Sequence, residues 1–180
     1  FWAMSRDAEL PNKGMEARFL VRMTDVTTEV LAKVKENMTE EDRSKRIENN
    51  IKMIVKKAEN KEREYTHSVS AMFNGNQYIL FTYEVFRDIR LVGAPPSDIG
   101  KFGGDTDNWM WPRHTGDFSL FRIYADKNNK PADYSVDNVP YKPKRHFNIS
   151  LKGVNEGDFT LIYGYPGTTN EYLPSYAIQN

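Results

Sequence analysis

The sequence predicts a mainly β protein, an antiparallel barrel or sandwich with a helical insertion at about residues 28–64. Three observations lead to this fold class. Short apolar stretches of strand length recur between turns rich in Pro, Gly and Asn. The dipeptide Asn74-Gly75 separates two of these stretches, which is a strong hairpin signal. The long helical pattern interrupts the series of strands instead of alternating with them, as expected for an insertion at one end of a barrel.

The first strand is predicted at residues 17–23 (ARFLVRM), where the apolar pattern alternates. Asp25, Thr27 and Thr28 follow it with side chains that can cap a helix, and a short helix is expected at residues 28–35. The chain therefore passes from a strand into helices.

A longer helix is predicted from Thr39, because acidic residues follow it at the positive end of the helix dipole. Its apolar residues recur with helical spacing and form one buried stripe, which consists of Ile47, Ile51, Ile54, Val55 and Ala58. Basic and acidic residues are interleaved on the remaining surface of this helix. That mixture favours a solvated face over a nucleic-acid footprint.

Strands are expected through the rest of the chain. They are predicted at residues 68–73, 77–83, 85–92, 118–124, 146–151 and 159–163.

Composition excludes several classes of function. The 25 basic and 25 acidic residues cancel, so no global field attracts nucleic acid or an anionic membrane. The absence of cysteine excludes disulfides, zinc-thiolate sites and thiol catalysis, and it fits a reducing or an oxidising compartment equally well. No apolar run approaches the length of about 18 residues that a membrane span needs.

The loop at residues 103–117 (GGDTDNWMWPRHTGD) combines a Gly-Gly pair, acids, a histidine, an arginine and two tryptophans. Loops ordinarily avoid exposed tryptophan, so this composition indicates a segment that binds or clamps something. A metal site made of Asp105, Asp107, His114 and Asp117 fits poorly, because a calcium loop would need glycine where Met110 stands. No metal and no cofactor are expected.

Asp117 suits the acid of a serine-protease triad. It follows Gly116 and directly precedes an apolar strand, so its carboxylate could accept the Nδ1–H of a histidine and fix the tautomer of that histidine. A turn cap explains the same residue equally well. The spacing alone does not decide between these two roles.

The segment at residues 103–122 closely resembles the region around the triad aspartate of bacterial serine dipeptidyl aminopeptidases of the dipeptidyl-peptidase VII and XI type. Residues 1–6 (FWAMSR), 9–11 (ELP), 19–22 (FLVR) and 164–170 (GYPGTTN) are similar to the same family. The resemblance therefore covers nearly the whole chain.

The resemblance implies a chymotrypsin-like double β-barrel, with residues 1–180 forming most of its first barrel within a partial catalytic domain. It also implies that Asp117 is the triad acid, and that Asn108 and Trp109 hold the free N-terminal amine of the substrate. These residue types suit that role, because an amide oxygen accepts from an ammonium group and an indole face attracts it. Trp111 matches no such role, and simple packing is expected for it.

The other two members of the triad are expected outside this chain. His67 and His146 lie at predicted strand starts without a motif, and the neighbours of His114 do not match the catalytic histidine of the family. Ser119 has no separate base and no oxyanion loop. The chain is therefore interpreted as a fragment of a longer protein, and the fragment alone is expected to be inactive.

The parent enzyme is expected to release dipeptides from oligopeptides that have a free N-terminus. The resemblance further implies a periplasmic location, with the signal peptide outside this chain, and a homodimer. Hydrophobic and acidic penultimate residues both stay open, because the residues that select them in this family lie near the serine. Two other functions are compatible with the sequence: a non-catalytic β-domain that binds peptides or glycans, and a trypsin-like endopeptidase.

Overall fold

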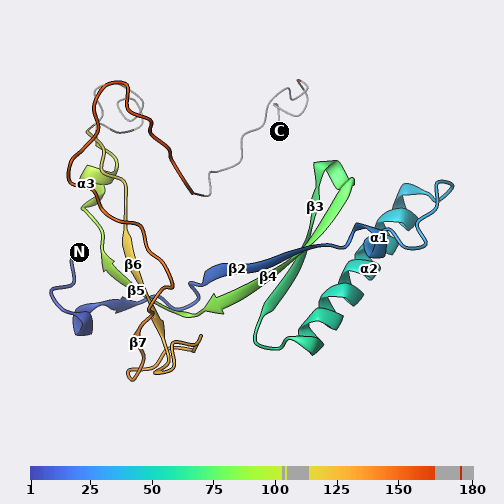
Figure 1. Cartoon of the computed structure of the whole chain (residues 1–180), viewed down its shortest axis with the longest axis horizontal. Helices are drawn as coiled ribbons and strands as arrows, with labels where there is room; N and C mark the ends of the chain where they lie inside the picture. The colour runs from blue at the N-terminus through green and yellow to red at the C-terminus, as the bar shows by residue number, and fades with distance from the viewer. Residues whose placement is uncertain (103, 105–113, 165–174, 176–180) are drawn as a thin grey trace. The chain divides into compact units, whose positions relative to one another are not determined.

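The computed structural model describes residues 1–102, 104, 114–164 and 175. The chain divides into two compact units, Phe1–Pro143 and Lys144–Asn180. The strands of the described residues form two antiparallel sheets, with the orders β1-β5-β6-β7 and β2-β4-β3 (Figure 1). The strands are β1 Leu10–Pro11, β2 Ala17–Asp25, β3 Thr66–Met72, β4 Gln77–Phe86, β5 Asp88–Gly93, β6 Leu120–Ala125 and β7 Val139–Pro140. The helices are α1 Thr27–Val30, α2 Glu40–Lys61 and α3 Ser97–Gly100.

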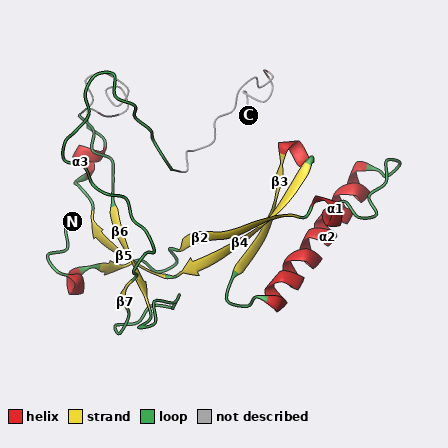
Figure 2. Cartoon of the chain, viewed as in Figure 1, coloured by secondary structure: helices red, strands yellow, loops and turns green. Residues whose placement is uncertain are grey.

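Helix α2 packs against the three-stranded sheet, as Figure 2 shows. Its apolar stripe contacts a core cluster formed by Val26, Val30 and Tyr78. Ile47, Ile51 and Ile54 are the residues of the stripe that reach this cluster. The Thr39 side chain accepts a hydrogen bond from the amide of Asp42 and caps the helix, which confirms the predicted start.

Helix α1 is shorter than predicted and is followed by turns. Lys33 adopts φ 63° in the left-handed region, which ends the helical run. The Asp25 carboxylate, a predicted cap, accepts from the hydroxyl and amide of Thr27 and from Gln77. The hydrogen bonds from Thr27 and Gln77 lower the pKa of Asp25 to about 2. The buried side-chain amide of Asn50 in α2 donates to the backbone carbonyls of Val30 and Ala32. These hydrogen bonds tie α2 to α1 and to the turn that follows α1.

The predicted hairpin is present between β3 and β4. Phe73, Asn74 and Gly75 all have positive φ angles and close a tight connection between the two strands. The turn is longer than a two-residue hairpin, because residues 73–75 form a short 3-10 turn. Asn-Gly therefore indicated the hairpin correctly.

Strand β4 leads through Arg87 into β5, which belongs to the other sheet. Phe86, at the end of β4, is fully buried with Ile89 and Ala125 in a second core cluster. The ring of Tyr141 lies 4.6 Å from that of Phe86. The continuous segment of β4 and β5 thus contributes one strand to each sheet. Strand β5 pairs with β6 in the four-stranded sheet.

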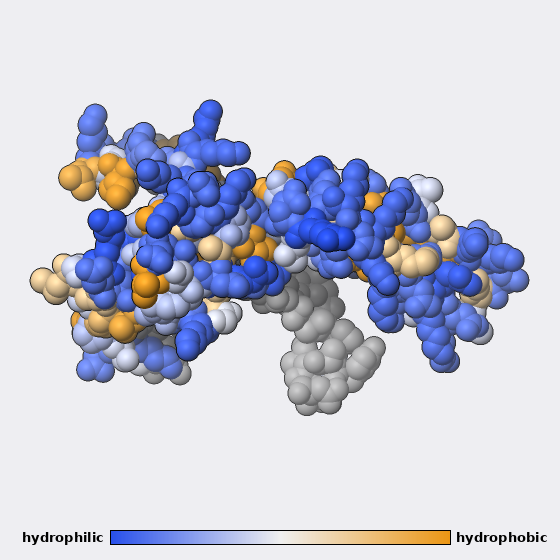
Figure 3. All heavy atoms as spheres, turned by 90° about the horizontal axis from the view of Figure 1, so that it is seen from below, coloured by the Kyte–Doolittle hydropathy of each residue, from blue (hydrophilic) through white to orange (hydrophobic). Residues whose placement is uncertain are grey.

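The expected barrel is not closed, which corrects the predicted fold. The structure supports a mainly β architecture of antiparallel sheets with helices between β2 and β3. Within the described residues, β2 pairs with β4 on one edge and has no partner on the other. Several apolar side chains of β2 are exposed, and apolar patches lie among hydrophilic residues on the face drawn in Figure 3. A barrel needs every edge paired, and among the described residues the outer edges of β2 and β3 are both unpaired.

The second unit does not contain the two strands predicted at residues 146–151 and 159–163. Large apolar side chains of these segments are at least 75% exposed; they are Phe147, Ile149, Leu151, Phe159, Leu161, Ile162 and Tyr163. A strand exists only when a neighbouring strand pairs with its backbone groups, and the described residues offer none here. The assignment of residues 1–180 to one partial catalytic domain stays a prediction.

Candidate active site

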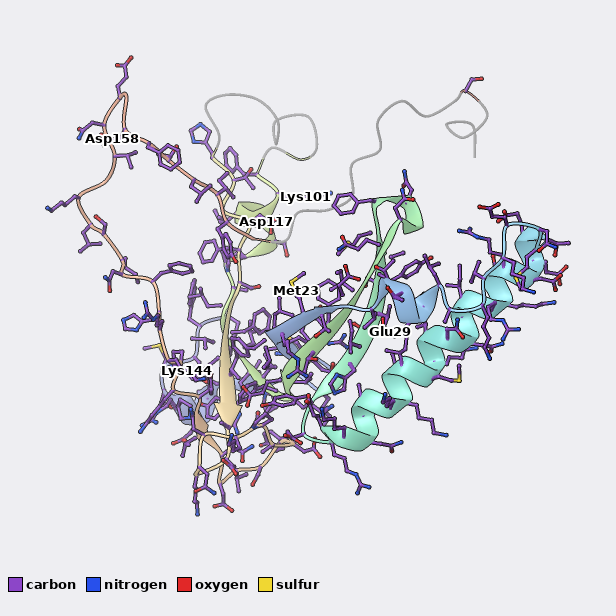
Figure 4. All side chains as sticks on the ribbon, turned by 45° about the vertical axis from the view of Figure 1, so that its right-hand side comes forward. Met23, Glu29, Lys101, Asp117, Lys144 and Asp158 are labelled. Atoms are coloured by element: carbon purple, nitrogen blue, oxygen red, sulfur yellow. The ribbon has the colours of Figure 1, made fainter. Side chains whose placement is uncertain are left out.

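Asp117 lies in the loop that enters β6 in the four-stranded sheet. The loop is anchored just before it, because the amide of Gly116 donates to the carbonyl of Ile99 at 2.9 Å. Asp117 also lies beside α3, and its Oδ1 is 3.9 Å from the position that a Cβ atom would take at Gly100 (Figure 4). Asp117 therefore lies within van der Waals reach of a side chain placed at Gly100.

The carboxylate of Asp117 is exposed, and no described residue donates a hydrogen bond to it. A carboxylate held at the edge of a strand with free lone pairs can accept an imidazole N–H. The triad role of Asp117 stays a prediction. A turn cap would instead accept from a nearby backbone amide, and the described residues show no such bond to Asp117.

The predicted amine-binding residues Asn108 and Trp109 lie outside the described residues, and so do Trp111, Asp105 and Asp107. Their assignments stay predictions. Among the residues that the structure describes, no three His, Asp or Glu side chains gather as a metal site, and no helix is long and apolar enough to cross a membrane.

The three histidines of the chain lie in different parts of the structure. His67 is buried in β3, where its Nδ1 lies 3.2 Å from the hydroxyl of Thr82. The ring of His114 packs edge-on against Phe102 at 5.6 Å, and His146 is exposed in the second unit. Within residues 1–102 and 114–164, no histidine forms a hydrogen bond with Asp117.

The first half of β5 carries a buried ion pair that sequence reasoning missed. Arg90 donates to both oxygens of Asp88, at 2.9 and 2.7 Å, although the two residues are only 9% and 1% exposed. Asn138 also donates to Asp88, and Arg90 lies over the ring of Tyr124 at 3.7 Å. Burial raises the pKa of Asp88, but the hydrogen bonds from Arg90 and Asn138 outweigh burial and hold this pKa below its ordinary value.

A second missed interaction ties β6 to the N-terminal segment. The buried carboxylate of Glu9 accepts from Nε of Arg122 and from the hydroxyl of Tyr124, each at 2.9 Å. Burial and the hydrogen bond to Glu9 raise the pKa of Tyr124. The alternation of charged and apolar residues at residues 88–92 was the available signal for Asp88 and Arg90, since a strand normally places such charges on one face. No pattern in the neighbouring sequence indicates that Glu9 forms this interaction, because its partners lie 113 and 115 residues away.

One known protein family is similar to this chain over its whole given length. The model for the family Peptidase S46 matches residues 1–180, so the chain belongs to the peptidase S46 family. This finding confirms the resemblance to dipeptidyl-peptidases.

Two curated proteins and one solved structure are similar to this chain. An Asp/Glu-specific dipeptidyl-peptidase of Capnocytophaga gingivalis is 64% identical over 99% of this chain and 25% of its own length. Dipeptidyl-peptidase 7 of the same organism is 50% identical over 98% of this chain and 24% of its own length. The crystal structure of Porphyromonas endodontalis DPP11 in complex with the dipeptide Arg-Glu superposes with a TM-score of 0.72 at 48% identity, covering 88% of this chain and 24% of that one. The chain thus spans about a quarter of the length of these relatives.

Proposed function

We propose that the full-length protein containing this chain is a serine-type dipeptidyl aminopeptidase, with Asp117 as the acid of a Ser-His-Asp triad. Membership of the peptidase S46 family over residues 1–180 carries this proposal. The exposed carboxylate of Asp117 at the entrance to β6 supports it, because that position leaves an acceptor free for an incoming imidazole.

In the proposed reaction, the Asp117 carboxylate accepts the Nδ1–H of a histidine supplied by another part of the protein. That histidine takes the proton of the serine hydroxyl as the oxygen attacks the second peptide carbonyl of the substrate. The histidine then returns the proton to the leaving amine, and water hydrolyses the acyl-enzyme. The free N-terminal amine is held by the Asn108 amide oxygen and the Trp109 indole face, so that cleavage falls after the second residue.

We further propose an acidic residue at the penultimate position of the substrate. Identity to the Asp/Glu-specific relative, 64%, exceeds identity to dipeptidyl-peptidase 7 of the same organism, 50%. The test compares reporter dipeptides that end in Asp, Glu, Leu or Met. Faster cleavage of the Leu and Met reporters would contradict the acidic preference and leave the dipeptidyl activity standing.

Acetylation of the substrate N-terminus is expected to lower cleavage by the full-length protein strongly. An acetylated dipeptide reporter lacks the ammonium group that Asn108 and Trp109 would bind, so its kcat/KM should fall about 10- to 150-fold, as for a lost charged hydrogen bond. For the variant Asn108→Ala, kcat/KM on the free-amine reporter should be lower than in the wild type. The ratio of kcat/KM between free-amine and acetylated reporters should then be close to one.

Equal cleavage of free and acetylated reporters would identify an endopeptidase instead, and would remove the proposed role of Asn108 and Trp109. Asn155→Ala is a matched control, because it replaces an exposed asparagine in the second unit. It is expected to keep the preference for free amines.

The resemblance also supports a periplasmic location, a homodimer and a chymotrypsin-like catalytic domain as proposals. Periplasmic extraction of cells that express the full-length protein tests the first, and light scattering of the purified protein tests the second. Activity found only in the cytoplasmic fraction, or the mass of a monomer, would contradict them.

A further inference from the structure

Trp2 lies directly across the end of β5. Its backbone forms an antiparallel bridge with Gly93, and flanking hydrogen bonds join Ala3 to Val92 and Ala94 to Phe1 at 2.9 and 2.8 Å. On its other side Gly93 pairs with Leu120, the first residue of β6. The end of β5 is therefore held between Trp2 and the beginning of the strand that follows Asp117.

The indole ring of Trp2 rests on the backbone of Gly93. A Cβ atom added at Gly93 would lie 2.9 Å from Cδ2 of the indole and closer still to Cε3 and Cζ3. Any side chain other than hydrogen would displace the ring, so glycine is required at this position for the ring to lie there. An aromatic ring that covers a strand glycine is a recognised way to fix local pairing.

The same ring reaches the residue that follows Asp117. The ring centroids of Trp2 and Phe118 are 6.2 Å apart with an interplanar angle of 50°, within the range of favourable aromatic pairs. Trp2 and Phe118 are 50% and 51% exposed, so burial in a core does not explain their contact. Their contact links residue 118 to the end of β5.

The residue before Asp117 is anchored independently. The Gly116 amide donates to the carbonyl of Ile99, and a Cβ atom at Gly116 would lie 3.1 Å from the Cγ2 of Ile99. Asp117 therefore stands between one neighbour fastened to α3 and another fastened to Trp2. Its own carboxylate makes no hydrogen bond with the described residues that would orient it.

We propose that Trp2 is a positioning residue, which orients the Asp117 carboxylate by packing on Gly93 and Phe118. This inference rests on the proposed triad role of Asp117. A carboxylate that orients a histidine must be placed closely, because a displacement of about 1 Å can cost about a hundredfold in rate. The backbone hydrogen bond of Gly116 on one side and the ring contact of Phe118 with Trp2 on the other supply that placement before the histidine is engaged.

The test uses the full-length protein and the variants Trp2→Ala, Gly93→Ala and Phe118→Ala. Each is expected to lower kcat about 10- to 100-fold with KM nearly unchanged, because orientation of Asp117 is lost and substrate binding is not. Gly93→Ala acts by pushing the indole away. In the Trp2→Ala background there is no indole to displace, so Gly93→Ala should cause no further loss.

A purely structural role is separated by repeating Trp2→Ala in the Asp117→Asn background. A residue that acts through Asp117 should then leave kcat unchanged, while any shift in the thermal unfolding midpoint persists. Phe73→Ala is the matched control, since Phe73 is an exposed aromatic residue at the β3–β4 turn and its loss should leave kcat as it is.

Each outcome is assigned to one of the two proposals. Full activity of Asp117→Asn would refute the proposed function itself. If Asp117→Asn is impaired but Trp2→Ala and Phe118→Ala keep normal kcat, or if Trp2→Ala lowers kcat equally in both backgrounds, the positioning role is overturned and the triad assignment stands.

Discussion

Asp117→Asn in the full-length protein is expected to lower kcat about 10⁴-fold with little change in KM. An asparagine side chain keeps the size of aspartate but removes the charge that stabilises the imidazolium, and it can hold the histidine in the wrong tautomer. Steady-state kinetics on a free-amine dipeptide reporter measure the effect. Because Asp117 is exposed and makes no hydrogen bond with the described residues, the substitution should leave the unfolding midpoint nearly unchanged.

Asp98→Asn provides the matched control for this experiment. Asp98 is an exposed aspartate in α3, the helix that flanks Asp117, and no triad role is assigned to it. It should keep normal kcat. Equal activity of the wild type and Asp117→Asn would remove the proposed triad role of Asp117.

Asp88→Ala is expected to destabilise the protein by about 3–5 kcal/mol, because it leaves the buried Arg90 guanidinium without its carboxylate. Both oxygens of Asp88 bind Arg90, and Asn138 would also lose an acceptor. Denaturant unfolding of the full-length protein, followed by tryptophan fluorescence, measures the loss. An unchanged midpoint would contradict the importance of this pair.

Glu16→Ala is the matched control, since Glu16 and Arg18 form an ion pair with the same sequence spacing as Asp88 and Arg90. This pair is 2.9 Å long but lies at the surface, where such pairs contribute at most about 1 kcal/mol. Glu16 also pairs with Arg87 at 3.3 Å, so this variant removes two exposed ion pairs and should still cost less than the loss of the one buried pair.

The effect of Asp88→Ala should also depend on pH. The pKa of Asp88 in the folded state lies below its ordinary value of 3.8, so its stabilising contribution is fully present above that value. It is lost as the pH falls through the lowered folded-state pKa, because the folded protein must then take up a proton. The difference in stability between wild type and Asp88→Ala should therefore shrink at acid pH.

Local patterns predicted the elements that depend on neighbouring residues. The start of α2 at Thr39, the hairpin at Asn74-Gly75 and the strand at residues 17–23 all rest on capping, turn conformation or alternation over a few residues. Alternation failed at residues 146–151 and 159–163, because it reports which side chains are apolar and not whether a partner strand exists.

The sequence by itself determined the mainly β class, the helical insertion, the family and the candidate acid Asp117, since all of these follow from short-range patterns and motif likeness. Only the tertiary structure decided that the barrel stays open within the described residues, that Glu9 holds β6 across 113 residues of chain, and that Trp2 covers Gly93. The physical reason is distance along the chain. Pairing of remote segments depends on how their backbone edges and buried charges meet in space, and no local propensity encodes that meeting.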